Sequence, residues 1–124
     1  MSNAESDATW VLLREITPPP EANACLVAGE TGIVAFATAN DWVLFSSHRL
    51  VLRQVRGLRG KKVRTTSVPW TAVAGWSTAT GKNRLDGAHI ELTTHGGPLF
   101  LEIGNAVDPV AVDRLVADRV LRLR

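Results

Sequence analysis

The strongest constraint on the fold is a change in hydrophobic periodicity near Asp108. Between residues 32 and 103 the chain consists of short segments in which apolar and polar side chains alternate, as Ala88, Ile90 and Leu92 alternate with polar neighbours. Residues that alternate with period two line opposite faces of a strand. After Asp108 the apolar residues recur every three or four positions, which is the period of an α-helix. The sequence therefore predicts a series of strands followed by one helix.

Turn-forming residues divide the alternating region into short strands. Clusters of glycine, serine, asparagine and aspartate separate the apolar segments, and these residues favour tight turns. Seven short strands in succession are typical of an antiparallel meander that closes into a barrel or a split sandwich. The strands are expected at residues 32–38, 42–45, 49–55, 61–68, 71–78, 88–93 and 99–103.

The C-terminal helix has a clear start and one apolar face. Asp108 is a favourable N-cap, and Pro109 follows at the first helical position, where its missing N–H is not needed. Five apolar residues share one face of this helix: Val112, Leu115, Val116, Val120 and Leu123. Burying such a stripe is enough to dock the helix over an open end of the sheet.

The N-terminal segment is ambiguous. Residues 5–17 contain a possible helix cap at Ser6 or Asp7, but Trp10 to Leu13 would serve equally well as a strand. Three consecutive prolines at 18–20 end either element, because proline fixes φ and donates no hydrogen bond. We therefore expect a lead-in over residues 1–26 and one domain over residues 27–124.

Charge is distributed unevenly along the chain. The net charge is only +2, yet residues 42–85 contain no acid, while the segments on either side are net acidic. The nine bases of this middle third are Arg49, Arg53, Arg56, Arg59, Lys61, Lys62, Arg64, Lys82 and Arg84. Such a block predicts a surface that binds anions or a partner.

Several functional classes find no support in the sequence. The single cysteine, Cys25, allows no intrachain disulfide or multi-cysteine metal site, and His48, His89 and His95 do not have metal-ligand spacing. No secretory signal or apolar run of about 20 residues is visible, so we expect a cytoplasmic protein. No nucleophile, base or carboxylate pair forms a catalytic pattern. The chain is therefore not expected to be an enzyme, or to use a cofactor, a metal or a small-molecule substrate.

A series of local motifs resembles the bacterial pleckstrin-homology (PH-like) family. The motifs lie at Gly29-Glu30, Asp41 to Leu52, Gly57 to Val63, Ser67 to Trp70 and Ala88 to Leu92, within residues 27–122. The resemblance implies a mainly β fold, a PH-like seven-stranded antiparallel split barrel with one C-terminal capping α-helix. It also implies a non-enzymatic interaction or scaffold module that forms homo-oligomers, including ring-like ones.

The glycine-rich segment 57–62 has the form of a β-turn. A phosphate-binding loop would need Gly and Ser or Thr at the positions of Val55 and Lys62. The bases around this turn are the candidate anion or partner surface: Arg56, Arg59, Lys61, Lys62 and Arg64. Such a surface would be solvated, lie between subunits or bind an anionic membrane weakly. Few aromatic residues lie among these bases, which argues against nucleic acid.

The tryptophans are expected to be core residues or interface anchors. If the protein self-associates, Trp70 and Trp76 are the candidate oligomer contacts, because tryptophan is enriched in interfaces.

Overall fold

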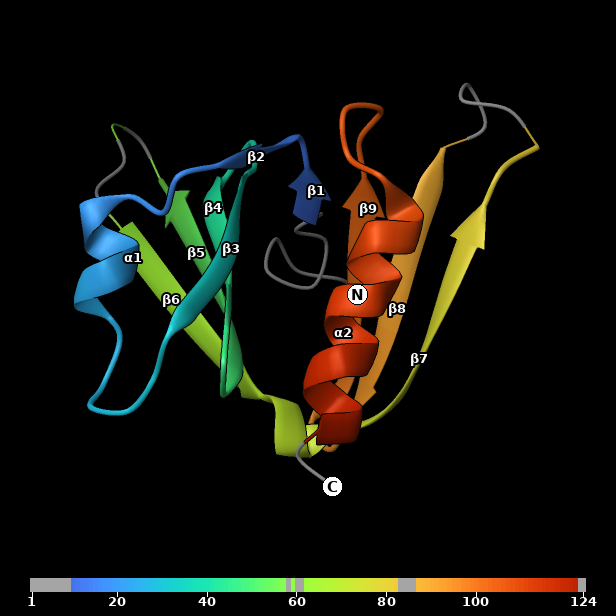
Figure 1. Ribbon diagram of the computed structural model, residues 1–124. Coiled ribbons are helices and arrows are strands. Elements are labelled where there is room, and N and C mark those ends of the chain that lie inside the picture. Colours follow the sequence, from blue (N-terminus) through green and yellow to red (C-terminus); the bar gives the residue numbers. More distant parts are fainter. Residues whose placement is uncertain (1–9, 58, 60–61, 83–86, 123–124) are drawn as a thin grey trace.

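Two β-sheets diverge from a corner formed by the 3-10 helix η2 (Trp70–Ala72), at the bottom of Figure 1. The computed structural model describes residues 10–57, 59, 62–82 and 87–122. The N-terminal sheet has the order β2 (Arg14–Ile16), β3 (Gly32–Ala37), β4 (Asp41–Ser46), β5 (Arg49–Arg56) and β6 (Lys62–Pro69). The C-terminal sheet has the order β1 (Trp10–Leu12), β9 (Gly97–Ile103), β8 (Ala88–Thr94) and β7 (Val73–Thr80). The helices are α1 (Pro20–Ala24) and α2 (Pro109–Arg122).

The predicted series of strands and the C-terminal helix are confirmed. Each of the seven expected segments corresponds to a strand, except that Thr71 and Ala72 belong to η2 and Lys61 lies outside the described residues. The helix α2 begins at Pro109, and the Asp108 side chain accepts a hydrogen bond from the backbone N–H of Val110 at 3.0 Å. The fold is therefore mainly β with one long C-terminal helix, as predicted. The described chain has nine strands rather than seven, because the ambiguous N-terminal segment supplies β1 and β2. The five-residue helix α1 was not predicted.

The N-terminal segment joins the two sheets. β1 pairs in parallel with β9, whereas β2 pairs in antiparallel with β3. The Gly104 N–H donates to Leu12 O at 2.8 Å, which continues the contact beyond the end of β9. The boundary predicted at residue 27 therefore does not separate these two strands from the sheets that they extend.

The main core lies between the sheets and under α2. Its largest fully buried side chains include Phe45, Leu52, Ile90 and Trp70, and α2 contributes Val112, Val116 and Val120. In Figure 1, α2 lies across the C-terminal sheet on the side of this core. The side chains of Ile90, Leu92 and Leu101 point toward it, because alternate residues of a strand share a face.

A second, smaller core covers the outer face of the N-terminal sheet. Ala22 of α1 packs there with Ala35, Trp42, Leu44 and Val51, and all five are buried. The outer face of the C-terminal sheet has no such cover from the described part of the chain, and its Phe100 is 49% exposed. We call the outward side chains of this sheet the open face: Ser77, Ala79, His89, Glu91, Phe100 and Glu102.

Candidate interaction surfaces

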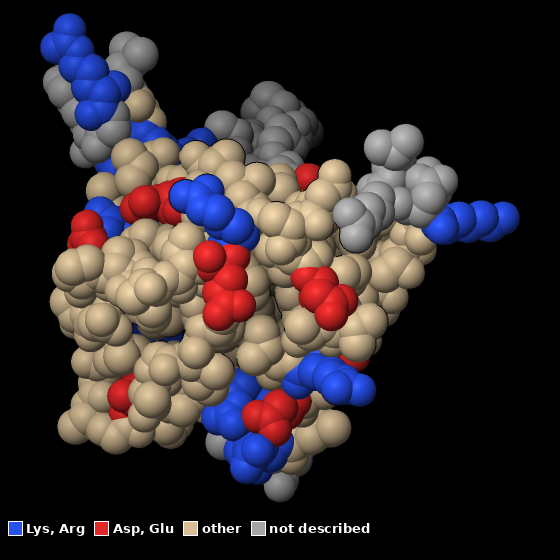
Figure 2. Space-filling view, turned by 45° about the horizontal axis from the view of Figure 1, so that its top comes forward, with Lys and Arg blue, Asp and Glu red and all other residues tan. Residues whose placement is uncertain are grey.

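Four described bases gather at the end of the β5–β6 hairpin, and we call them the basic hairpin: Arg56, Arg59, Lys62 and Arg64. Arg56 lies directly opposite Lys62, and Gln54 lies opposite Arg64. Cross-strand partners and alternate residues share a face, so Arg56, Lys62 and Arg64 point to the same side. Figure 2 shows Lys and Arg side chains projecting at this end of the molecule, at the upper left. Lys61, the fifth predicted base, lies outside the described residues.

Two other bases of the middle third are paired with acids from the N-terminal third. Arg49 forms an ion pair with Glu30, and Arg53 Nε lies 3.1 Å from Asp41 Oδ2. Arg53 also lies 3.8 Å from Glu21 Oε2. Folding therefore neutralises part of the positive block.

Glu30 is the most perturbed acid of the described chain, and its contacts are structural. Its side chain is 2% exposed and accepts hydrogen bonds from Arg49 Nε at 2.8 Å, Ser46 Oγ at 2.5 Å and the Val27 N–H at 3.1 Å. The Arg49 guanidinium is the largest cause that lowers the pKa of Glu30 to about 2, against the opposing effect of burial. Since protein donors satisfy both carboxylate oxygens, Glu30 fastens the loop before β3 to the β4–β5 turn.

The structure decides between the two roles expected for Trp70, core residue and oligomer contact. Its side chain is fully buried in the main core, and its Nε1–H donates to Ser46 O at 2.8 Å. It also packs on Phe45, with ring centroids 5.7 Å apart. Trp70 follows Pro69 at the corner between the sheets, which turns the ring inward. It offers no surface to a second molecule, so the prediction that Trp70 is an exposed oligomer contact is wrong.

Trp76 is half-buried and holds α2 against β7. Its Nε1–H donates to Asp113 Oδ1 at 3.0 Å, and Thr78 Oγ1 donates to the same oxygen at 2.8 Å. The polar atom of the indole is thus used within the molecule. Contact of Trp76 with another subunit stays a prediction.

The open face combines an aromatic pair with two acids. The rings of His89 and Phe100 lie 4.6 Å apart between centroids at an interplanar angle of 57°. Glu91 is the direct cross-strand partner of Phe100, and Glu102 is that of His89. The four side chains therefore form one compact cluster. The site was not predicted from the sequence. Its only signal there is an aromatic residue, Phe100, at a position that alternates with the apolar Leu99 and Leu101.

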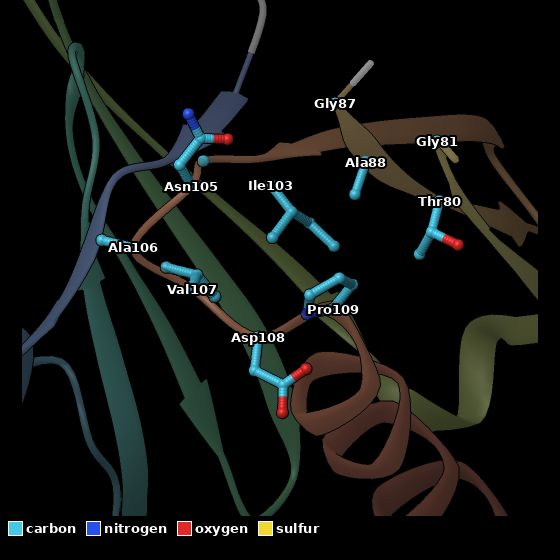
Figure 3. Close-up of a pocket in the computed structure, with 11 residues that line it drawn as sticks. Thr80, Gly81, Gly87, Ala88, Ile103, Asn105, Ala106, Val107, Asp108 and Pro109 are labelled. Carbon is cyan, nitrogen blue, oxygen red and sulfur yellow. The ribbon is translucent and has the colours of Figure 1, made fainter. Parts of the chain in front are cut away.

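A pocket of about 430 Å³ lies where β7, β8 and the start of α2 meet (Figure 3). Thr80, Ile103 and Pro109 point into the same space, whereas Asp108 points away from it toward the helix. The remaining lining is mostly backbone and small side chains. The lining contains one charged side chain, Asp108, and its carboxylate caps the helix. The described part of the lining therefore offers neither a catalytic pair nor a cationic anchor.

The described residues hold neither a metal site nor a membrane-spanning helix. Residues 10–57, 59, 62–82 and 87–122 contain no group of three His, Cys, Asp or Glu side chains placed to hold a metal ion. Within the same ranges, no helix is long and apolar enough to cross a membrane. The surfaces that stand out are the basic hairpin and the open face, and both are suited to macromolecular contacts.

Comparison with known proteins identifies the family. The family model described as bacterial PH domain matches residues 14–120. The chain belongs to the bacterial PH domain family. PH domains are generally non-catalytic.

Two solved structures of PH domains from Shewanella are similar to this one. A DUF1696 family protein with a pleckstrin-homology domain from Shewanella loihica PV-4 is 25% identical, with a TM-score of 0.79, and the match covers 86% of this chain and 96% of that chain. A pleckstrin homology domain from Shewanella amazonensis SB2B is 28% identical, with a TM-score of 0.65, covering 81% and 82%. No curated protein matches the chain. The similarity supports the PH fold and assigns no ligand.

Proposed function

We propose that this bacterial PH domain is a cytoplasmic, non-enzymatic interaction module that self-associates through its C-terminal sheet. The observation that carries the proposal is the open face. The outer face of the N-terminal sheet is covered by α1, whereas the corresponding face of the C-terminal sheet presents Phe100 at 49% exposure beside His89. An exposed aromatic residue ringed by polar groups is typical of a protein contact.

The edge of the same sheet favours association as well. β7 is an edge strand of eight residues, Val73–Thr80, and contains no charged residue and no proline. Edge strands are usually protected by charges, prolines or cover, because their unpaired backbone groups can bond to another chain. The other long edge strand, β6, carries Lys62, Arg64 and Pro69 and is protected in this sense. The β7 edge of the C-terminal sheet is therefore less protected against pairing with another chain than the β6 edge of the N-terminal sheet.

Light scattering coupled to size-exclusion chromatography, at tens of micromolar protein, tests this proposal. The wild type is expected to elute as an oligomer, and Phe100→Ser is expected to shift it toward monomer. Leu121→Ser is the matched control, because Leu121 is 63% exposed on α2, away from the open face. A wild type that remains strictly monomeric, or equal effects of the two variants, would contradict the proposal.

A second candidate function is weak binding of an anionic membrane through the basic hairpin. The observation that favours it is that Arg56, Lys62 and Arg64 share one face of β5 and β6. Bases near an anionic membrane contribute about 1 kcal/mol each, so four give about 4 kcal/mol and a dissociation constant near millimolar. Such binding would need the avidity of an oligomer.

Co-sedimentation with vesicles tests this alternative. Vesicles containing phosphatidylserine are expected to pellet the wild type more than an Arg56→Glu/Lys62→Glu variant, and neutral phosphatidylcholine vesicles are expected to pellet neither. If the variant pellets as well as the wild type, the basic hairpin is not a membrane site.

A further inference from the structure

We infer that the open face of one molecule binds the basic hairpin of a second copy. This inference rests on the self-association proposed above and adds the two surfaces that meet. Its first support is charge. The charged groups of the open face are Glu91 and Glu102, with no lysine or arginine among them, whereas the basic hairpin carries four bases and no acid. Complementary charge steers association and fixes which surfaces meet.

The two surfaces also match in spacing. Both are built on pairs of antiparallel strands, in which direct partners are about 5 Å apart and alternate residues about 7 Å apart. On the open face, Glu91 and Glu102 occupy diagonal positions across β8 and β9. On the hairpin, Arg56 lies opposite Lys62, and Arg64 follows two residues further along β6. Two bases can therefore meet two carboxylates without a change in either backbone.

The aromatic pair gives the open face a specific contact for a guanidinium group. Phe100 exposes half of its surface, and His89 supports its ring from one side. Arginine stacks on aromatic rings and can pair with a carboxylate at the same time. Since Glu91 is the direct neighbour of Phe100, one arginine of the hairpin can do both. This arrangement explains an exposed phenylalanine between acids better than a purely apolar contact does.

The contact must form between molecules. The end of the β5–β6 hairpin and the C-terminal sheet diverge from the η2 corner and lie on opposite sides of the molecule in Figure 1. Each chain thus carries the acidic open face and the basic hairpin at separate places on its surface. The contact joins two different surfaces. Each molecule that is added to an assembly therefore offers one of these surfaces, still unoccupied, to a further copy.

Charge reversal of the full chain tests the inference. The acceptor variant is Glu91→Lys/Glu102→Lys, and the donor variant is Arg56→Glu/Lys62→Glu. Each alone is expected to self-associate at least about tenfold more weakly than the wild type in sedimentation velocity, and an equimolar mixture is expected to associate again. The variant with all four substitutions is expected to self-associate as well, because both signs are reversed together.

Two control variants change the charge away from the proposed contact. Val63→Glu places an acid on the opposite face of the same hairpin, where Val63 is 51% exposed, and Glu15→Lys reverses an exposed acid on β2. Both are expected to associate like the wild type. Circular dichroism and thermal unfolding of every variant establish that the fold is retained.

The outcomes separate this inference from the proposed function. If Phe100→Ser disperses the wild-type oligomer but the donor variant does not, self-association stands and the pairing with the hairpin is wrong. Failure of the mixture to associate also overturns the pairing. Loss of binding to phosphatidylserine vesicles by a donor variant that still assembles would assign the hairpin to the membrane instead. A monomeric wild type would contradict the proposed function itself.

Discussion

Arg49 and Glu30 form a two-point ion pair at the junction between the loop before β3 and the start of β5. Arg49 Nε donates to Glu30 Oε2 at 2.8 Å, and Arg49 Nη2 donates to Oε1 at 3.0 Å. The same Nη2 donates to Cys25 O at 2.6 Å, and Nη1 donates to Ser67 Oγ at 2.9 Å. One guanidinium group therefore ties the segment after α1 to both β5 and β6.

Loss of the Glu30 charge is expected to destabilise the fold strongly. Glu30→Gln should lower the free energy of unfolding by about 3 kcal/mol, because it leaves a partly buried guanidinium without its counter-charge. Urea unfolding at neutral pH measures the change. Asp118→Asn, in the exposed pair of Asp118 and Arg122, is the control and should leave the urea midpoint unchanged. A similar small effect of both substitutions would show that the Glu30 pair contributes little.

Stability is expected to fall in acid because of the same residue. The pKa of Glu30 is lowered from 4.5 to about 2 in the folded protein, so its carboxylate stabilises the fold fully above pH 4.5. This contribution, about 3 kcal/mol, is lost as the pH falls through about 2. Urea unfolding over this window should show the difference between wild type and Glu30→Gln shrinking. A constant difference down to pH 2 would contradict the assignment.

Gly104 is expected to tolerate no side chain. A Cβ atom at this position would lie 2.8 Å from the backbone oxygen of Leu12, the acceptor of the Gly104 N–H. Gly104→Ala should therefore push β1 from β9 and lower the free energy of unfolding by about 1–3 kcal/mol. At Gly96 the nearest atom to such a Cβ is 3.8 Å away, so Gly96→Ala is the control. Equal thermal midpoints for the two variants would argue against this close contact.

Trp70 is expected to act on stability and not on assembly. Trp70→Phe removes the hydrogen bond to Ser46 O and leaves space in a fully buried site, which should cost about 2–4 kcal/mol. Its oligomeric state should match that of the wild type under conditions where both are folded. Dispersal of the oligomer without loss of stability would restore Trp70 as a contact residue.

Local patterns predicted the strands of the PH fold well, because alternation and turn residues act over a few neighbours. The segment from Ala88 to Ile103 shows this, since its outward and inward positions follow directly from the sequence. β1 and β2 have three residues each, and an alternation of apolar and polar side chains cannot be recognised in so short a segment. Their place depends on β9 and β3, which lie far along the chain.

The surfaces were less predictable than the strands, because composition does not show which charges meet. The acid-free middle third predicted a basic surface around the β5–β6 turn, but it did not show that Arg49 and Arg53 are paired with acids from the first 41 residues. Periodicity could not place Trp70, because it lies at a corner between strands. Whether a side chain on a sheet is covered by another element also depends on the whole fold. Phe100 is notable only because no described element packs over its side of the sheet.

The parallel pairing of β1 with β9 also constrains the order of events during synthesis. Trp10 and Leu12 are buried, and their register partners are Leu101 and Ile103. A ribosome releases these two segments at opposite ends of translation of the domain. Trp10 and Leu12 therefore lack their partners in the nascent chain until β9 has emerged. Only then can β1, the first strand to be made, pair with β9 and join the two sheets.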